Sequence, residues 1–374
     1  MSILRNLIVL FIVGAFLWHL YGDSFEQAGF IGVYEDVRDD LHEIWEHPVV
    51  SNSVDWVKQE VQYLADRLSD QQTEDIAPSS QEKPSLSPPS EQTFSIHNIV
   101  LGDDRNDVED QVGEPKRTSR NEYGVDWVAY HESYQNFIMV SYNEQDKVNA
   151  MYTNHDLLSS SNGLTFASTR DEVLSVMPKP LKALRKGLIN YQIQDNGEFN
   201  MFKLDDSYVT FFYDKHQGSK VTSILIIDEE LEEQKRKYFA EPDQQLREGL
   251  EYVLFDLTNS TRVKFGLPAL EWNESARETV RAHSEDMAEQ SYFSHTNLQG
   301  QSPFDRLTED AISYRIAGEN LATGQPSSIF AHEGLMNSLG HREHKLRNGY
   351  ESLSVGVAFD KNSQPYYTEN YLAD

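Results

Sequence analysis

The sequence contains no cysteine, and this absence narrows its chemistry at once. Without thiols the chain cannot form disulfides, use a cysteine nucleophile, hold an iron–sulfur cluster or bind zinc through sulfur. Basic residues are also scarce, because 32 Lys and Arg face 61 Asp and Glu and leave a net charge of −29. A nucleic-acid partner is therefore excluded, since phosphate backbones are bound by clustered Lys and Arg.

Several common catalytic motifs are missing as well. No GxSxG, GxGxxG or Walker loop occurs, which argues against the commonest hydrolases, dinucleotide-binding enzymes and phosphoryl-transfer enzymes. His332 and Glu333 begin like a zincin helix, but the residue four after His332 is Met336, so the HExxH pattern fails. The remaining composition, with 39% hydrophobic residues in 374, is that of a globular chain long enough for two domains.

Long apolar runs are limited to the N-terminus, where residues 7–21 read LIVLFIVGAFLWHLY. Arg5 precedes this run and an acidic stretch follows it, so we predict a signal anchor over residues 1–21 that places the rest of the chain outside the cytoplasm. No small-x-small cleavage site follows the run, although a cleaved signal peptide, and hence secretion, is the alternative. The expected location is the cell membrane, with a single span and the membrane as a partner through this helix.

The next segment, residues 22–94, holds 16 acidic and 4 basic residues. Apolar residues recur between 54 and 68 at spacings of three and four, which predicts a helix. This helix could associate with a second copy as a short coiled coil, or it could pack alone on the following domain. From Asp70 onward the stretch is rich in Pro, Ser, Gln and Glu, and it is typical of an extended linker.

Residues 95–242 alternate between apolar and polar positions and are rich in aromatics, which predicts strands. An internal repeat is visible at an offset of 65 residues, because Arg105 and Val108 align with Arg170 and Val173. Each copy begins with a short helix, capped by Asp103 or Asp104 in the first copy and by Ser168 or Thr169 in the second. We therefore predict a duplicated α+β domain, and it carries no motif that indicates catalysis.

Residues 244–374 predict two helices, several short elements, a further helix and two final strands, an order that suits a small α/β sandwich. The first helix is expected to be amphipathic and to stop at Gly266. We expect the segment AGENLATG to form a glycine-bounded turn. The stretch REHKLRN, which contains His344, has the charge density of a solvated surface.

Three residues in this C-terminal segment could carry chemistry: His295, Glu319 and His341. Two imidazoles and a carboxylate from separate loops could hold a divalent metal with an open position, or they could act as base and orienter. Each could equally be a hydrogen-bonded structural residue, and Glu319 could cap backbone amides. His283 lies within a helix, where a core or solvated position is the better expectation.

The strings HSEDMAEQSYFSHTNLQGQSPFDRL, AGENLATG, LMNSLGHREHKLRNGYESLSVGVAFD and YYTENY resemble the bacterial branch of the CAP superfamily. This superfamily comprises cysteine-rich secretory proteins, antigen five and pathogenesis-related proteins, and its domain is also called SCP-like. The duplicated region before it resembles the CAP-associated N-terminal domain. The resemblance implies a three-layer α-β-α sandwich over 244–374 with a cleft lined by two His and two acidic residues.

On this resemblance the cleft residues are His295, Glu319 and His341, while the second acidic position falls near Ser338, with Glu333 upstream. A cleft of this kind could bind zinc through His295 and His341, as some members do. CAP domains have been linked to lipid binding, cell-wall association and proteolysis, so the family does not settle the activity.

Two functions follow as hypotheses. The first is a membrane-tethered, non-catalytic module whose cleft binds a cell-envelope lipid, glycan or protein. The second is a metal-assisted hydrolase of peptide or envelope polymers, with Glu319 as the catalytic base or as the orienter of a bound water. A third possibility gives the functional role to the repeat domain and makes the CAP domain a protein-contact surface.

Overall fold

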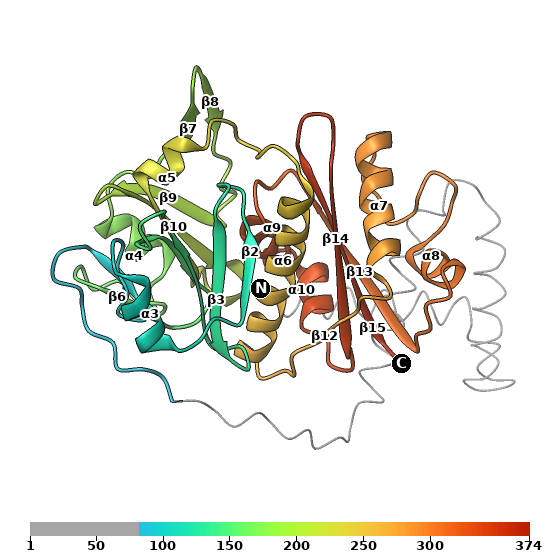
Figure 1. Cartoon of the computed structure of the whole chain (residues 1–374), viewed down its shortest axis with the longest axis horizontal. Helices are drawn as coiled ribbons and strands as arrows, with labels where there is room; N and C mark the ends of the chain where they lie inside the picture. The colour runs from blue at the N-terminus through green and yellow to red at the C-terminus, as the bar shows by residue number, and fades with distance from the viewer. Residues whose placement is uncertain (1–81) are drawn as a thin grey trace, which may run out of the picture. The chain divides into compact units, whose positions relative to one another are not determined.

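The computed structural model describes residues 82–374, which belong to one compact unit, Ala77–Asp374. The predicted anchor over 1–21, the acidic stretch and the apolar stripe over 54–68 lie outside the described residues. Within 82–374 no helix is both long and apolar enough to cross a membrane. The described part is a mixed α/β structure built around two separate sheets (Figure 1).

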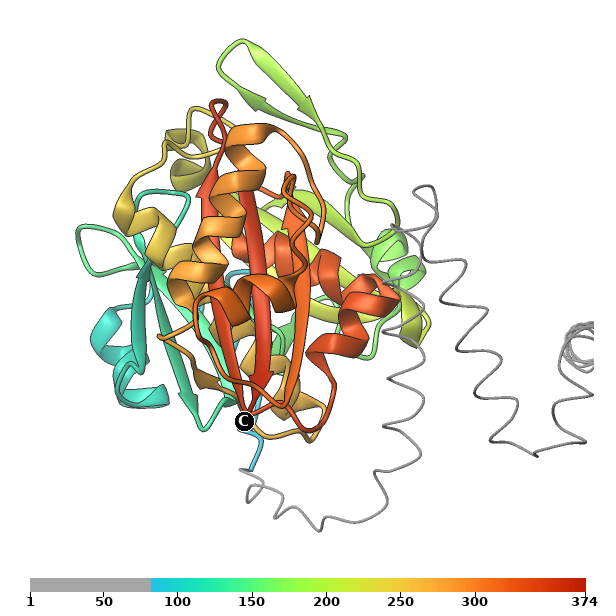
Figure 2. The same ribbon diagram turned by 90° about the vertical axis from the view of Figure 1, so that its right-hand side faces the viewer.

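The first sheet has seven strands, all of them antiparallel to their neighbours, and it makes the N-terminal part of the unit sheet-rich. Along the sheet the strands are β2 (Arg117–Arg120), β3 (Asp126–Glu132), β4 (Gln135–Tyr142), β5 (Val148–Thr153), β11 (Lys220–Asp228), β10 (Ser207–Asp214) and β9 (Phe199–Leu204). One face packs against α3 (Arg105–Val112), α4 (Arg170–Val176) and the pair β1 (Phe94–Ile96) and β6 (Leu158–Ser160). A separate hairpin, β7 (Ala183–Lys186) and β8 (Ile189–Gln192), projects from this region (Figure 2).

The two halves of this sheet close with equivalent backbone hydrogen bonds. Val148 N donates to Asp103 O, and Val221 N donates to Ser168 O, in each case 2.9 Å from donor to acceptor. The halves meet where β5 pairs with β11. Their helix starts differ. Thr169 caps α4, as expected, and forms a capping box with Glu172, whereas the expected cap at Asp104 was wrong, because its side chain makes no capping bond at the start of α3.

The second sheet has four strands in the order β12 (Glu271–Trp272), β14 (Ser352–Phe359), β15 (Pro365–Ala373) and β13 (Ile316–Thr323). One of its faces is covered by α7 (Arg277–Gln290) and α8 (Pro303–Glu309), as Figure 2 shows. Its other face is covered by α6 (Gln244–Lys264), α9 (Ser328–Asn337) and α10 (Leu339–Lys345). This arrangement is a three-layer α-β-α sandwich.

Helix α6 lies between the two sheets and belongs to both cores (Figure 1). Leu250 and Leu254 pack in the core of the four-stranded sheet, whereas Val253 and Leu257 pack against the seven-stranded sheet. The expectation of a single apolar face was therefore too narrow. The helix ends at Lys264, and Gly266 follows it with a φ of 76°, in keeping with the predicted stop.

Two expectations for the C-terminal segment were wrong. All of the predicted turn AGENLATG except Gly324 lies in the eight-residue strand β13, because its backbone pairs with β15. Gly318 is needed there for space, since a Cβ would lie 2.2 Å from the hydroxyl oxygen of Tyr350. The supposedly solvated stretch REHKLRN forms most of α10, and Lys345 within it is fully buried because a carboxylate from β15 pairs with it.

Gly249 marks a close backbone contact between α6 and the seven-stranded sheet. A Cβ on Gly249 of α6 would lie 1.9 Å from the carbonyl oxygen of Arg120 on β2. We expect Gly249→Ala to lower the free energy of unfolding by about 1–3 kcal/mol, because the helix and strand must move apart. Urea denaturation measures this change. Gly340→Ala is the matched control, since a Cβ on this helical glycine meets nothing within 4 Å, and equal effects of the two variants would contradict the prediction.

Candidate functional site

The four residues assigned to the cleft by resemblance lie on three segments of the sandwich. His295 follows α7, Glu319 is on β13, Ser338 separates α9 from α10, and His341 is on α10. His295 Nδ1 lies 2.9 Å from Glu319 Oε1, and His341 Nδ1 lies 2.7 Å from Ser338 Oγ. The two pairs are close enough for the charge of His295 to contribute to lowering the pKa of His341.

The carboxylate of Glu319 is the most constrained group of the site. Its side chain is buried, and Oε2 accepts hydrogen bonds from Arg306 Nη2 at 2.7 Å and from Asn370 Nδ2 at 3.3 Å. Burial alone would raise the pKa of Glu319, but the hydrogen bond from His295 and the charge of Arg306 outweigh it and hold the pKa below its usual range. Glu319 is therefore ionised at neutral pH, with both oxygens engaged.

The ionised carboxylate fixes the orientation of His295. A carboxylate can only accept, so Nδ1 of His295 donates to it and Nε2 is the acceptor of the neutral ring. The His295 side chain is 47% exposed, so this nitrogen is available to a ligand. In His341, burial lowers the pKa and favours a neutral ring at pH 7. The site thus presents two oriented imidazoles above a buried carboxylate.

Arg306 is a site residue that no sequence pattern singled out. Besides its bond to Glu319, its Nη1 donates to the backbone oxygens of His295 at 2.8 Å and Gln301 at 3.1 Å. The residue is positioned by α8, which begins with Pro303 and a capping box between Ser302 and Asp305. The S-P-x-D pattern predicts this helix, but nothing in the sequence alone indicates that Arg306 reaches Glu319.

Neither predicted location of a second acidic residue supplies a carboxylate beside His341. Position 338 is a serine, and the Glu333 carboxylate points to the other domain, where it accepts from Tyr152 Oη at 2.8 Å and Ser223 Oγ at 2.6 Å. Glu369 of β15 is the buried carboxylate close to His341, and its charge favours the protonated ring. Glu369 is itself paired with buried Lys345, so it is not a free acid.

The remaining histidines of the segment have structural partners. His344 Nδ1 contacts Glu319 O at 3.2 Å and Asn320 Oδ1 at 3.0 Å, and burial lowers its pKa to about 4. His283 is buried, as one of the two expectations had it, and its Nε2 contacts Ser294 O at 3.0 Å. His332 Nε2 contacts Thr261 Oγ1 at 2.8 Å.

The donor set does not fit a resident zinc ion. Among residues 82–374 no group of three or more His, Cys, Asp or Glu side chains is arranged to hold a metal. Glu319 is occupied by His295, Arg306 and Asn370, which leaves only Nε2 of His295 and of His341. A catalytic zinc site uses three protein ligands, so these two nitrogens are too few to form such a site.

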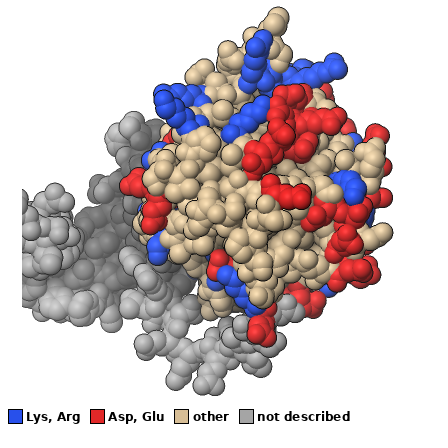
Figure 3. Space-filling view, turned by 90° about the vertical axis from the view of Figure 1, so that its left-hand side faces the viewer, with Lys and Arg blue, Asp and Glu red and all other residues tan. Residues whose placement is uncertain are grey.

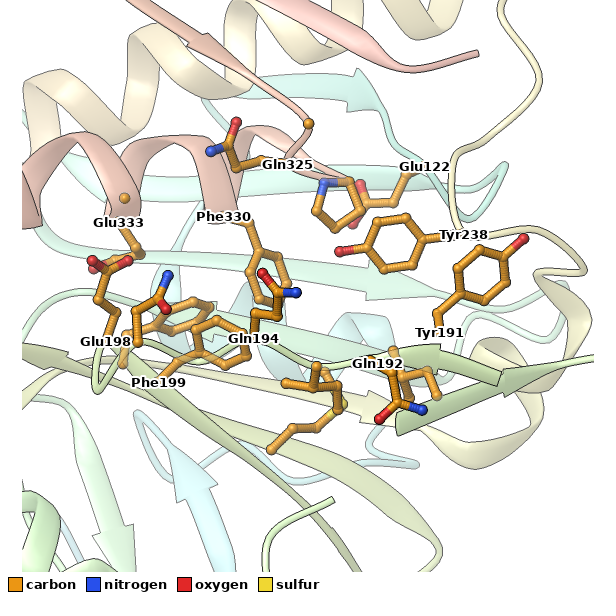
Figure 4. A pocket seen from close by; sticks show the side chains of 18 of the residues that line it. Glu122, Tyr191, Gln192, Gln194, Glu198, Phe199, Tyr238, Gln325, Phe330 and Glu333 are labelled. Carbon is orange, nitrogen blue, oxygen red and sulfur yellow. The ribbon is translucent and has the colours of Figure 1, made fainter. Parts of the chain in front are cut away.

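A hollow of about 400 Å³ lies between the two domains, and none of His295, Glu319, Ser338 and His341 lines it. Figure 4 shows the rings of Tyr191 and Tyr238 beside each other near one end and Phe330 further in. Amide side chains also line it, and Gln325 Oε1 is buried without a hydrogen-bond partner among the described residues. Charged residues such as Glu122, Glu198 and Lys235 line it as well, so the lining is mixed and indicates no single class of ligand.

Family models match both parts of the compact unit. The cysteine-rich secretory protein family, CAP, matches residues 255–371, and the CAP-associated N-terminal domain matches residues 101–238. The fold and the oriented His–Glu site define a CAP-type sandwich with an additional sheet-rich domain in front of it. The chain belongs to the bacterial CAP proteins that carry this CAP-associated domain, which confirms the resemblance noted in the sequence.

Two proteins of Bacillus subtilis strain 168 are similar in sequence. The uncharacterized membrane protein YlbC is 29% identical over 292 residues, which cover 73% of this chain and 82% of YlbC. The uncharacterized protein YkwD is 39% identical over 122 residues, which cover 33% of this chain and 46% of YkwD. YkwD thus matches over about half of its length only.

Two solved structures share the fold. An extracellular SCP-domain protein from Bacillus anthracis has a TM-score of 0.63 at 23% identity, with 79% of this chain matching all of that one. A cysteine-rich secretory protein from Staphylococcus aureus has a TM-score of 0.57 at 18% identity, covering 73% of this chain and 91% of that one. The share of this chain that matches the Bacillus anthracis chain is about the size of the compact unit, Ala77–Asp374.

The Arg306–Glu319 pair gives a stability prediction. Glu319→Gln would leave the guanidinium of Arg306, which is 9% exposed, without its counter-charge. We expect the free energy of unfolding to fall by about 3 kcal/mol. Urea denaturation should show a change within about 0.5 kcal/mol for the control Glu309→Gln, which alters an exposed residue of α8, the helix of Arg306. Similar losses in both variants would show that the pair does not hold the site together.

His344 gives a pH prediction. Its pKa is about 4 in the folded protein against 6.5 for an unperturbed histidine, so the unfolded chain takes up the proton first as the pH falls. The stability that the neutral ring contributes is complete above pH 6.5 and is lost as the pH falls towards 4. The difference in unfolding free energy between wild type and His344→Asn should therefore shrink by about 1.4 kcal/mol per pH unit in this window. A difference that does not change with pH would contradict the assignment.

Proposed function

We propose that this protein is an extracytoplasmic, membrane-associated binding module whose CAP domain recognises a cell-envelope ligand at the cleft of His295, Glu319 and His341. The relative YlbC is named a membrane protein, and the Bacillus anthracis neighbour is named an extracellular protein. Both names agree with the anchor and orientation expected from residues 1–21. The proposal therefore combines an envelope location with a site on the CAP domain.

One observation carries the assignment of the cleft. The His295 ring is half exposed, yet its orientation is fixed from beneath by Glu319, which is in turn held by Arg306. A solvent-facing imidazole without a binding role has no need of a buried carboxylate and guanidinium to orient it. Preorganised polar groups of this kind lower the entropic cost of binding a ligand.

The hydrolytic alternative has less support from the same geometry. The Glu319 oxygens already accept bonds from three side chains, so Glu319 is a positioning residue and not a free base. The two open imidazole nitrogens are too few for a zinc-activated water. Recognition of a ligand needs only the hydrogen-bonding capacity that the rings offer, and it is therefore the function that the site supports best.

The test measures sedimentation of residues 77–374 with isolated cell envelopes. We expect the double variant His295→Ala, His341→Ala to reduce the bound fraction by about tenfold, because each lost hydrogen bond in a preorganised site contributes roughly 0.5–1.5 kcal/mol. His97→Ala is the matched control, since this histidine lies in the N-terminal domain against Gln111. Equal loss of binding in the control, or none in the double variant, would refute the cleft as the binding site.

Calorimetry with zinc alone separates the two functions. The binding module should show no saturable site for zinc in wild type. A one-to-one site that disappears in the double variant would contradict the metal-free cleft and would favour the hydrolase.

A further inference from the structure

The hairpin β7–β8 differs in charge from the rest of the chain. Residues 177–194 contain four basic residues and no acidic residue, in a protein with a net charge of −29. Lys186 is buried and pairs with Glu232, but Lys179, Lys182 and Arg185 are exposed and form no ion pair with another described residue. Figure 3 shows basic side chains at the projecting top of this face, with a large group of acidic side chains directly beside them.

The tip of the hairpin is apolar. Gly187 and Leu188 form a two-residue turn between the paired residues Lys186 and Ile189. Leu188 is 96% exposed, whereas the other large exposed hydrophobic residues in the described chain reach at most 62%. Ile189 beside it is 56% exposed and extends the apolar tip. Turns of this length usually carry polar residues at such a position, so an almost fully exposed leucine has no role in the fold itself.

The hairpin is held beside its turn and in mid-strand, so the tip has a defined position. The Lys186–Glu232 pair is buried, with 5% and 7% of the side chains exposed. Tyr191 of β8 stacks on Tyr238, with ring centroids 5.2 Å apart and an angle of 20° between the planes. Figure 2 shows the hairpin extending well beyond the neighbouring elements, and this projection exposes the tip to a flat surface.

We propose that the tip of β7–β8 is a docking element for an anionic lipid bilayer. Leu188 and Ile189 would enter the region between headgroups and acyl chains, while Arg185 would lie at the level of the lipid phosphates. Lys182 and Lys179 lie further from the tip, where their charges would attract the anionic surface over a longer range. An anionic wall polymer would satisfy the cations alone, but it offers no apolar phase for an exposed leucine. The pairing of an apolar tip with unpaired cations therefore favours a bilayer over a soluble polyanion.

The test measures binding of residues 77–374 to vesicles of phosphatidylglycerol and phosphatidylcholine in equal parts, and to vesicles of phosphatidylcholine alone. This unit omits residues 1–76, so the predicted anchor does not contribute. We expect Leu188→Ser to weaken binding to the anionic vesicles by about tenfold. Arg185→Glu should weaken it by about fivefold or more. Wild type should bind the neutral vesicles at least about fivefold more weakly than the anionic ones.

Matched controls use residues of the same kind on other surfaces. Leu298→Ser removes another exposed leucine, and Lys361→Glu makes the same type of charge reversal on an exposed loop. Both should bind the anionic vesicles as wild type does, and circular dichroism should show all variants folded. The cleft variant His295→Ala, His341→Ala should also bind vesicles normally, which separates this proposal from the function of the cleft.

A fluorescence experiment is possible because the chain contains no cysteine of its own. A single cysteine introduced by Leu188→Cys can carry an environment-sensitive fluorophore, with Leu298→Cys as the reference. A blue shift on adding anionic vesicles is expected at position 188 only. Equal vesicle binding by wild type and Leu188→Ser would overturn the proposal. Tighter binding of soluble polyglycerol phosphate, insensitive to Leu188→Ser, would also overturn it and identify the hairpin as a polyanion site.

Discussion

The structure depends on the simultaneous burial of α6 by two sheets. Helix α6 carries two buried carboxylates that point in different directions, and each forms ion pairs with basic side chains on the side that it faces. Asp256 accepts from Arg117 at 2.9 Å and from Tyr134 at 2.9 Å in the N-terminal domain. Glu251 accepts from Arg277 and Arg281 of α7. Because a buried carboxylate is costly without such partners, these ion pairs define the orientation of α6 between the sheets.

The same rule applies throughout this acidic protein. Most buried carboxylates of the described residues are paired with buried or half-buried cations: Glu319 with Arg306, Glu369 with Lys345, Asp214 with Arg342 and Glu232 with Lys186. Glu333 is an exception, since hydroxyl groups of the other domain satisfy it. Of the 32 basic residues in the chain, six of those in the described part are buried. Exposed cations without a partner, as on the β7–β8 hairpin, are therefore informative about what lies outside the protein.

The local sequence pattern correctly predicted those features of the fold that depend on neighbouring residues in the chain. The strands, the helix cap at Thr169 and the stop at Gly266 follow from alternation, capping chemistry and backbone conformation. The errors came from partners distant in sequence. Glu319 lies in a strand because β15 pairs with that segment some fifty residues later, and Lys345 is buried because Glu369 compensates its charge. The cleft was found through family resemblance, and Arg306 was missed because its role exists only in the folded site.

The shared helix also affects how this protein could be divided. A cut near residue 243 separates the two family regions in the sequence, but it does not separate two self-sufficient cores. A CAP sandwich excised there would expose Val253 and Leu257 to water, and the seven-stranded sheet left behind would lose the apolar cover that these residues give it. Gene fusions that exchange one region for another would therefore need a matched α6, so the pair is expected to be inherited as a single unit.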